Sequence, residues 1–461
     1  MKNKTIFLLV GLKSITHSFL LLSFLGISVL TLNACSNMPS VAGVSDVPIP
    51  FSDHPAVLQG LTTDRRIELS IVIEARSSVS YVLESLSGSQ RWTPQVQDRI
   101  ARHFSPWAVD RVIFTGLAPE QRYRFRILDE NKHVRDERIA TTRSLVKDSA
   151  RIALVSCASD HVDEKEQRAL WKELTAHRPD YLFMLGDNVY ADYDDTGTSP
   201  IRTPEALWSR YVESRMRIEL YRQKELIPTL AIWDDHDTGR DNANRYTPTL
   251  SYAREIFFAF FPQSPLQNIL ERGPGLSFVW NAFGAEFYFL DDRSFRSENN
   301  APVADETHFG KATEQWLFKQ VGQNRPAWII SGDQFFGAYH SFESFEGNHP
   351  RSFSRFIRTL RKARRPLWFV SGDRHLTELQ RIERPVLGFQ TYELTTSPIH
   401  SALFADEWKE HPNPRQIHGA SGTWNYAIVQ MQARSQKLDL NIEAWGVAGK
   451  LLYREHVVIA K

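Results

Sequence analysis

The hydrophobic and polar positions of this chain follow three successive patterns. Residues 18–32 are almost wholly apolar, residues 54–147 alternate apolar and polar positions in short runs, and from residue 148 onward apolar runs are separated by amphipathic segments. Alternation with a period of two, as in 67–73 and 123–128, predicts half-buried strands. Short apolar runs interleaved with amphipathic segments predict a layered α/β domain. The pattern therefore indicates two folded regions after an apolar start.

The first folded region, residues 54–147, is predicted to be a small antiparallel β-sandwich. Leu117, Ala118 and Pro119, followed by Tyr123, resemble the tyrosine-corner segment of fibronectin-type sandwiches. We see no metal-ligand spacing in this region. We expect it to be a spacer or one wall of a cleft rather than a catalytic part.

The second folded region, residues 148–461, is predicted to be an α/β domain. Its strand candidates are 152–156, 181–185, 229–233, 327–331 and 367–371, with a hairpin-like stretch at 276–290. Its helix candidates are 162–177, 204–221, 250–261, 312–323 and 352–364.

The apolar start is typical of an export signal. Its 15 residues are short for a membrane span, which needs about 20, and they lead into Leu-Asn-Ala-Cys at 32–35, which resembles a bacterial lipobox. We expect residues 1–34 to be a lipoprotein signal peptide, Cys35 to be lipidated and residues 35–53 to be a linker. A plain transmembrane anchor is the alternative. Ser36 favours anchoring at the outer membrane, facing the periplasm or the cell surface.

Composition and charge exclude several classes of protein. Hydrophobic residues make up 42% and charged residues 24% of the chain, which excludes wholesale disorder, and a mean hydropathy of -0.36 excludes a polytopic membrane protein. Lys and Arg number 55 against 54 Asp and Glu, so no specific nucleic-acid binding is expected. With Cys35 lipidated, Cys157 is the one thiol left in an oxidising compartment, where it is either buried or occupied chemically.

Polar side chains follow nearly every predicted strand of the second region. The segments concerned are Cys157, Gly186-Asp187-Asn188-Val189-Tyr190, Trp233-Asp234-Asp235-His236-Asp237, Asp291-Asp292-Arg293, Ser331-Gly332-Asp333-Gln334 and Ser371-Gly372-Asp373-Arg374-His375. Ligands of α/β sheets bind beyond the carboxyl ends of the strands, so these side chains are expected to converge in one site. Several buried carboxylates would repel each other unless cations lay between them. Two cations roughly 3.5–4 Å apart are a standard device for displacement at phosphorus, with a metal-bound hydroxide as the nucleophile.

The order of these motifs resembles that of the alkaline phosphatase D (PhoD-like) family of the calcineurin-like metallophosphoesterase superfamily. The resemblance runs from about residue 54 to 450. It implies a four-layer αββα sandwich preceded by a small antiparallel, fibronectin-III-like β-sandwich. It also implies a metal-dependent phosphomonoesterase or phosphodiesterase that acts on a small-molecule or polymer phosphate ester.

The resemblance also implies a role for each motif residue. An iron(III) ion would be held by Cys157, Asp187, Tyr190 and His375, and a calcium ion by Asp187, Asp235 and Asp373. Asp187 would thus bridge the two sites, with Gln334 near the second. His236 would contact the phosphate or protonate the leaving oxygen. Zinc or manganese are alternatives to this metal pair, because the chain lacks the twin-arginine signal that exports folded iron-calcium members and would acquire its metal outside the cytoplasm.

Some alternatives stay open at this stage. Arg293 could clamp the substrate phosphate or pair with Asp291 or Asp292, and Asp234 and Asp237 could merely brace their loop. The enzyme could be a phospholipase D-like or wall-polymer phosphodiesterase held near its substrate by the lipid anchor. A non-catalytic envelope binding protein on a decayed hydrolase fold is the other class, although every mapped position is present. No protein partner is expected, and membrane contact would be through the anchor alone.

Overall fold

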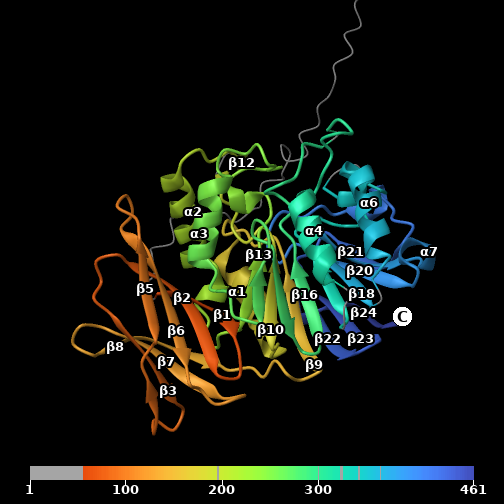
Figure 1. Cartoon of the computed structure of the whole chain (residues 1–461). Coiled ribbons are helices and arrows are strands. Elements are labelled where there is room, and N and C mark those ends of the chain that lie inside the picture. The colour runs from red at the N-terminus through yellow and green to blue at the C-terminus, as the bar shows by residue number, and fades with distance from the viewer. Residues whose placement is uncertain are drawn as a thin grey trace, which may run out of the picture. The chain divides into compact units, whose positions relative to one another are not determined.

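A computed structural model describes residues 55–194, 197–299, 301–321, 325–340, 343–363 and 365–460 (Figure 1). The predicted signal peptide, Cys35 and the linker up to residue 53 lie outside the described residues. Within the part that is described, none of the helices combines the length and the apolar character that a membrane crossing requires.

The amino-terminal region is the antiparallel β-sandwich that the alternating pattern predicts. One sheet has the order β1-β2-β6-β5 and the other β4-β3-β7-β8. The strands are β1 (Ala56–Thr62), β2 (Arg66–Glu74), β3 (Ser80–Ser85), β4 (Arg91–Trp92), β5 (Val96–Ala101), β6 (Trp107–Thr115), β7 (Arg122–Leu128) and β8 (Val134–Thr141). The hydroxyl of Tyr123 accepts a hydrogen bond from the backbone N–H of Ala118 at 2.8 Å, which confirms the predicted tyrosine corner.

The remainder of the chain forms two larger sheets. The six-stranded sheet has the order β13-β10-β9-β22-β23-β24, and the eight-stranded sheet β14-β15-β16-β17-β18-β20-β19-β21. Their strands are β9 (Ser149–Val155), β10 (Tyr181–Leu185), β13 (Thr229–Ile232), β14 (Leu270–Arg272), β15 (Phe278–Ala282), β16 (Ala285–Phe289), β17 (Ala327–Ile330), β18 (Leu367–Ser371), β19 (Leu376–Ile382), β20 (Thr391–Thr396), β21 (Gln416–Ser421), β22 (Asn425–Arg434), β23 (Lys437–Gly446) and β24 (Leu451–Ala460). A two-stranded ribbon, β11 (Tyr193–Asp194) and β12 (Gly197–Thr198), lies in the loop after β10.

The two large sheets pack face to face through aromatic side chains. Phe183 of β10 contacts Trp280 of β15 and Phe287 of β16, with ring centroids 5.8 and 5.5 Å apart. Figure 1 shows α1, α2 and α3 beside β10 and β13, and α4 and α6 beside β16 and β18. The helices are α1 (Glu164–Ala176), α2 (Pro204–Arg217), α3 (Leu250–Phe260), α4 (Gly310–Gln320), α5 (Phe345–Asn348), α6 (Pro350–Leu360), α7 (Arg384–Leu387) and α8 (Glu407–Glu410), with 3-10 turns at Glu219–Tyr221, His236–Thr238 and Val447–Gly449. The predicted four-layer α/β fold is thus observed.

Strand direction brings the polar segments to one end of the sheets. Strands β9, β10 and β13 are mutually parallel, and so are β16, β17, β18 and β20. The segments that follow these strands therefore emerge at the carboxyl edges, where the sequence pattern placed the chemistry. Strands β19 to β24, which complete both sheets after residue 375, were not among the strands predicted from the hydrophobic pattern.

Candidate metal centre

Four of the predicted ligands share an unusual backbone conformation directly after their strands. Cys157, Asp187, Asp373 and His375 have φ angles of 55°, 51°, 62° and 51°. A positive φ is uncommon for residues other than glycine, and it is maintained only where the surrounding structure enforces it. Such clustering is typical of functional sites, where a sharp turn directs a side chain inward instead of continuing the strand.

The first cluster of predicted ligands consists of Cys157, Asp187, Tyr190 and His375. The Sγ atom of Cys157 lies 3.5 Å from Oδ2 of Asp187, and the hydroxyl of Tyr190 lies 3.2 Å from Nε2 of His375. Nδ1 of His375 lies 2.7 Å from the carbonyl oxygen of Ala402, which can only accept a hydrogen bond. The proton is therefore on Nδ1, and the lone pair of Nε2 faces the cluster, as a metal-ligating histidine requires.

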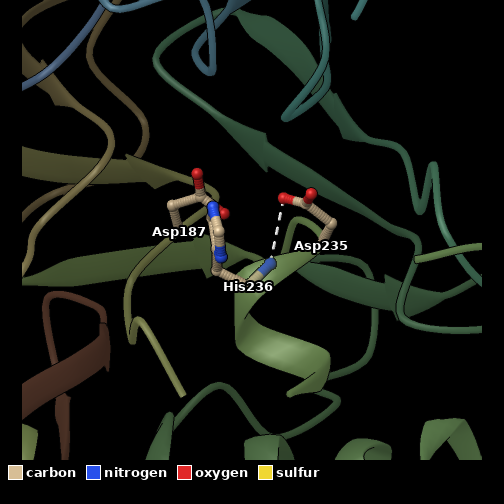
Figure 2. A group of neighbouring side chains, drawn as sticks. All are labelled: Asp187, Asp235 and His236. Carbon is tan, nitrogen blue, oxygen red and sulfur yellow. Dashed lines mark hydrogen bonds between the residues drawn. The ribbon is translucent and has the colours of Figure 1, made fainter. Parts of the chain in front are cut away.

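The second cluster shares Asp187 with the first. Asp187, Asp234, Asp235 and Asp373 each present a carboxylate oxygen, and these oxygens lie within 4.8 Å of one another. Figure 2 shows the carboxylates of Asp187 and Asp235 beside the ring of His236, with the backbone N–H of His236 donating to Asp235. Oδ1 of Asp187 is buried and has no hydrogen-bond partner. A buried oxygen without a donor requires compensation, so the donor set fits a bound cation beside Asp187.

The pKa shifts of the two clusters also favour bound cations. Burial, and then the charge of Asp373, raise the pKa of the Cys157 thiol to about 11. Burial, and then Cys157, raise the pKa of Asp187 well above its ordinary value. The protein alone thus disfavours the thiolate and carboxylate forms that bind metal. Bound cations would reverse both shifts by stabilising the anions, so metal binding is expected to release protons.

His236 is held between an aromatic ring and a carboxylate. Its ring stacks on Tyr190 with centroids 4.4 Å apart, and its Nδ1 lies 2.7 Å from Oδ1 of Asp192. Its Nε2 lies 3.9 Å from Asp241, and 12% of the side chain is exposed. Burial lowers the pKa of His236, but the carboxylates of Asp192, Asp235 and Asp187 outweigh that effect and hold the pKa well above its ordinary value. A protonated imidazole is thereby available at the edge of the metal centre.

Arg293 is fully buried and pairs mainly with Asp234. The sequence had suggested a clamp on the substrate phosphate or a pair with Asp291 or Asp292, and not this partner. Its Nε donates to Oδ1 of Asp234, and its Nη2 lies 3.2 Å from Glu343. Asp292, one of the predicted partners, lies 3.9 Å from Nε of Arg293. Asp291, the other, accepts a hydrogen bond from the backbone N–H of Arg293 and not from its guanidinium group. The reason is the path of the chain. Strands β13 and β16 belong to different sheets, and the segments that follow them meet where these two strands end. Arg293 thus offsets the charge of the second cluster, and its contact with substrate stays a prediction.

Comparison with known proteins identifies the family to which these residues belong. The sequence profile of the PhoD-like phosphatases matches residues 152–444, more than half of the chain and a range that includes all six predicted ligands. The chain belongs to the PhoD-like phosphatase family. Alkaline phosphatase D of Bacillus subtilis (strain 168) is 24% identical over 336 residues, 63% of this chain and 56% of that protein, so the match spans little more than half of the relative's length. The solved structure of PhoD matches 92% of each chain with a TM-score of 0.67 at 17% identity, which shows the fold.

Two further motif residues of this PhoD-like chain have structural roles. Asp237 accepts hydrogen bonds from the backbone N–H groups of Asn188, Val189 and Asp234. It therefore braces its loop, which is one of the roles considered for it from the sequence. The side-chain amide of Gln334 donates to Glu378 at 2.7 Å and to Thr395 at 3.0 Å. The side-chain nitrogen of Gln334 is therefore engaged by Glu378 and Thr395, and the predicted place of Gln334 near the second cation stays a prediction.

Some described residues beside the predicted ligands had no role assigned from the sequence, namely Asp192, Glu343, Arg296 and Asp333, of which only Asp333 belonged to a motif. Asp192 orients His236, and Asp333, Glu343 and Asp373 form a third acidic group beside the second cluster. Arg296 donates to Asp333 at 2.8 Å. Asp333 could be found from the sequence, because it follows a glycine at the end of a predicted strand. Glu343 and Asp192 lie in loops without a motif, so only the fold reveals their place.

Proposed function

We propose that this PhoD-like protein is a metal-dependent phosphoric ester hydrolase that uses two cations on either side of Asp187. The observation that carries the proposal is the position of Asp187. Its Oδ2 faces Cys157, its Oδ1 has no partner, and it belongs to both groups of ligands. A carboxylate shared in this way is suited to hold two cations a few ångströms apart.

The donor chemistry supports iron in the first site and calcium in the second. Cys157, Tyr190 and His375 offer a thiolate, a phenolate and an imidazole, which suit a transition metal. Asp235 and Asp373 offer carboxylate oxygens alone, which suit a hard cation such as calcium. Zinc or manganese in either position is the alternative. When bound, such cations supply charge neutralisation at phosphorus and activation of water.

His236 acts in this proposal as the general acid for the leaving oxygen. The proton is held on an imidazole whose Nδ1 is bound to Asp192 at 2.7 Å, so Nε2 is the atom that reaches a substrate. The stack on Tyr190 fixes the plane of the ring. Arg293 stays with Asp234 and offsets part of the negative charge of the second cluster.

The location of the protein is a separate proposal that rests on the sequence alone. We infer that it is an exported lipoprotein, anchored at the outer membrane through Cys35, and that it reaches small or polymeric phosphate esters outside the cytoplasm. Metabolic labelling with a lipid precursor tests this directly. The label is expected in the wild-type protein and absent from Cys35→Ala, and equal labelling of both would contradict it.

The activity is tested with paired phosphomonoester and phosphodiester model substrates. We expect hydrolysis of at least one, a loss of at least about a hundredfold in His236→Asn, which is the range for a general acid, and bound metal unchanged in that variant. The ratio of the two rates gives the ester preference. Full activity in His236→Asn would refute the role of this residue, and no hydrolysis by metal-loaded wild-type protein would refute the function.

A further inference from the structure

An exposed aromatic ring lies directly against one of the predicted metal ligands. The ring of Phe404 has its centroid 5.3 Å from that of His375 and is tilted by 35° to it. Phe404 is 38% exposed. On its other side His375 approaches Tyr190, its partner in the first cluster. Phe404 thus extends the wall of the metal centre toward solvent.

The segment that carries Phe404 is fixed in place on both sides of the ring. The carbonyl oxygen of Ala402 accepts from His375 at 2.7 Å, and that of Ser401 accepts from the indole of Trp424 at 2.8 Å. Beyond the ring, the carbonyl oxygen of Ala405 accepts from the hydroxyl of Ser421 at 2.9 Å. Three anchored carbonyls within five residues present the ring in one position, so little ordering would be needed when a ligand binds.

Acidic side chains also lie on the exposed side of the centre. Asp373 and His375 are partly exposed, so solvent reaches the ligands between them. Asp241 lies on the His236 side, where its side chain is 34% exposed, and Glu343 lies in the acidic group that includes Asp373. An apolar portion of a substrate finds no favourable surface beside these carboxylates. The ring of Phe404 offers one.

We propose that Phe404 determines specificity by stacking on a planar aromatic group of the ester, while the phosphate lies at the cation sites. This inference rests on the proposed hydrolase function and names a substrate class for it, namely phosphate esters of aromatic or heteroaromatic groups. An aromatic face favours another ring over an aliphatic chain because the two quadrupoles attract in offset and edge-on arrangements. Such a contact, remote from the reacting phosphorus, contributes to substrate binding, so it acts on KM more than on kcat.

The test compares phenyl phosphate with glycerol phosphate as substrates of the purified full-length enzyme. Phe404→Ala is expected to lower the ratio of the two kcat/KM values about tenfold, the loss typical of one stacked ring, through a higher KM for phenyl phosphate. Phe404→Leu keeps an apolar side chain without the ring, and the same direction of change is expected. Leu403→Ala is the matched control, because Leu403 is also 38% exposed and precedes Phe404 in the same segment.

Each outcome decides the inference. A ratio that falls in both Phe404 variants and not in Leu403→Ala, with wild-type metal content, supports it. A ratio that is unchanged in Phe404→Ala, or fully retained in Phe404→Leu, overturns it even though the enzyme hydrolyses both esters. An equal fall in Leu403→Ala also overturns it. Wild-type enzyme that hydrolyses neither ester would instead refute the proposed function, and this inference with it.

Discussion

Nδ1 of His236 lies 2.7 Å from Oδ1 of Asp192, and this pair connects the loop after β10 to the turn after β13. Asp192 is buried, and its other oxygen, Oδ2, has no hydrogen-bond partner. The imidazole of His236 is therefore the hydrogen-bond partner of the Asp192 carboxylate among the described residues. A carboxylate in this position fixes both the orientation and the protonation of the histidine.

Asp192→Asn is expected to shift the pH dependence of hydrolysis. Because Asp192 contributes to the raised pKa of His236, its removal lowers that pKa. A general acid must be protonated, so the fall of kcat/KM on the alkaline side moves to lower pH, and kcat drops about tenfold or more. The measurement is the pH profile of kcat/KM, with Asp64→Asn as the control, because Asp64 is a half-exposed aspartate of the sandwich. An unchanged profile would refute the positioning role.

Arg293→Met is expected to destabilise the protein strongly. Arg293 is fully buried, and its loss leaves Asp234 as a buried charge without its cation. Breaking one partner out of a buried pair typically lowers the free energy of unfolding by about 3 kcal/mol or more. The double variant with Asp234→Asn should recover much of that loss, because no uncompensated charge remains. Urea unfolding of the two single variants and the double variant gives the coupling, and additive effects would contradict the pairing.

His400 is expected to make the fold less stable in acid. It is fully buried, its Nε2 accepts from the indole of Trp171 at 2.9 Å, and its Nδ1 donates to the carbonyl of Ser159 at 2.9 Å, so the ring is neutral. Burial lowers its pKa from 6.5 to about 4. Between these values the unfolded chain binds more protons than the folded one. The free energy of unfolding therefore falls as the pH drops through this window and is fully recovered above it.

The measurement compares wild type with His400→Gln at pH 7 and pH 5. Wild type should lose about 2 kcal/mol more than the variant over this interval, since each pKa unit corresponds to about 1.4 kcal/mol. His103→Gln, at an exposed position of the sandwich, is the control. Equal losses in wild type and His400→Gln would show that His400 does not carry this pH dependence.

The sequence predicted the part of the fold that positions the chemistry. Strands β9, β10, β13, β17 and β18 are short apolar runs, and each is followed by a polar residue after a sharp turn, so the convergence of Cys157, Asp187 and Asp373 could be inferred. The carboxyl-terminal strands were missed although β23 and the second half of β22 alternate buried and less buried positions. The place of β22 depends on its pairing with β9, far away in the chain, which local pattern does not encode, and β23 and β24 add to the sheet beyond β22.

The partners of site residues were less predictable than the residues themselves. Arg293 pairs with Asp234, 59 positions earlier, because strands from two different sheets end at the same place. Asp192 contacts His236 across 44 positions, from a loop without a motif. Such pairs arise only once both sheets are packed. Residue type and spacing therefore predict which side chains enter a site, and tertiary packing decides which of them bind each other.

The central claim is that Asp187 holds two different cations, of which Cys157 ligates only one. The most direct test is the metal content of purified wild type, Cys157→Ser and Asp187→Asn by elemental analysis, with hydrolysis measured on the same samples. We expect one transition metal and one hard cation per wild-type chain, loss of the transition metal alone in Cys157→Ser, and loss of both metals and of activity in Asp187→Asn. Wild-type protein that binds no metal after loading, or Asp187→Asn that retains both metals, would contradict this account.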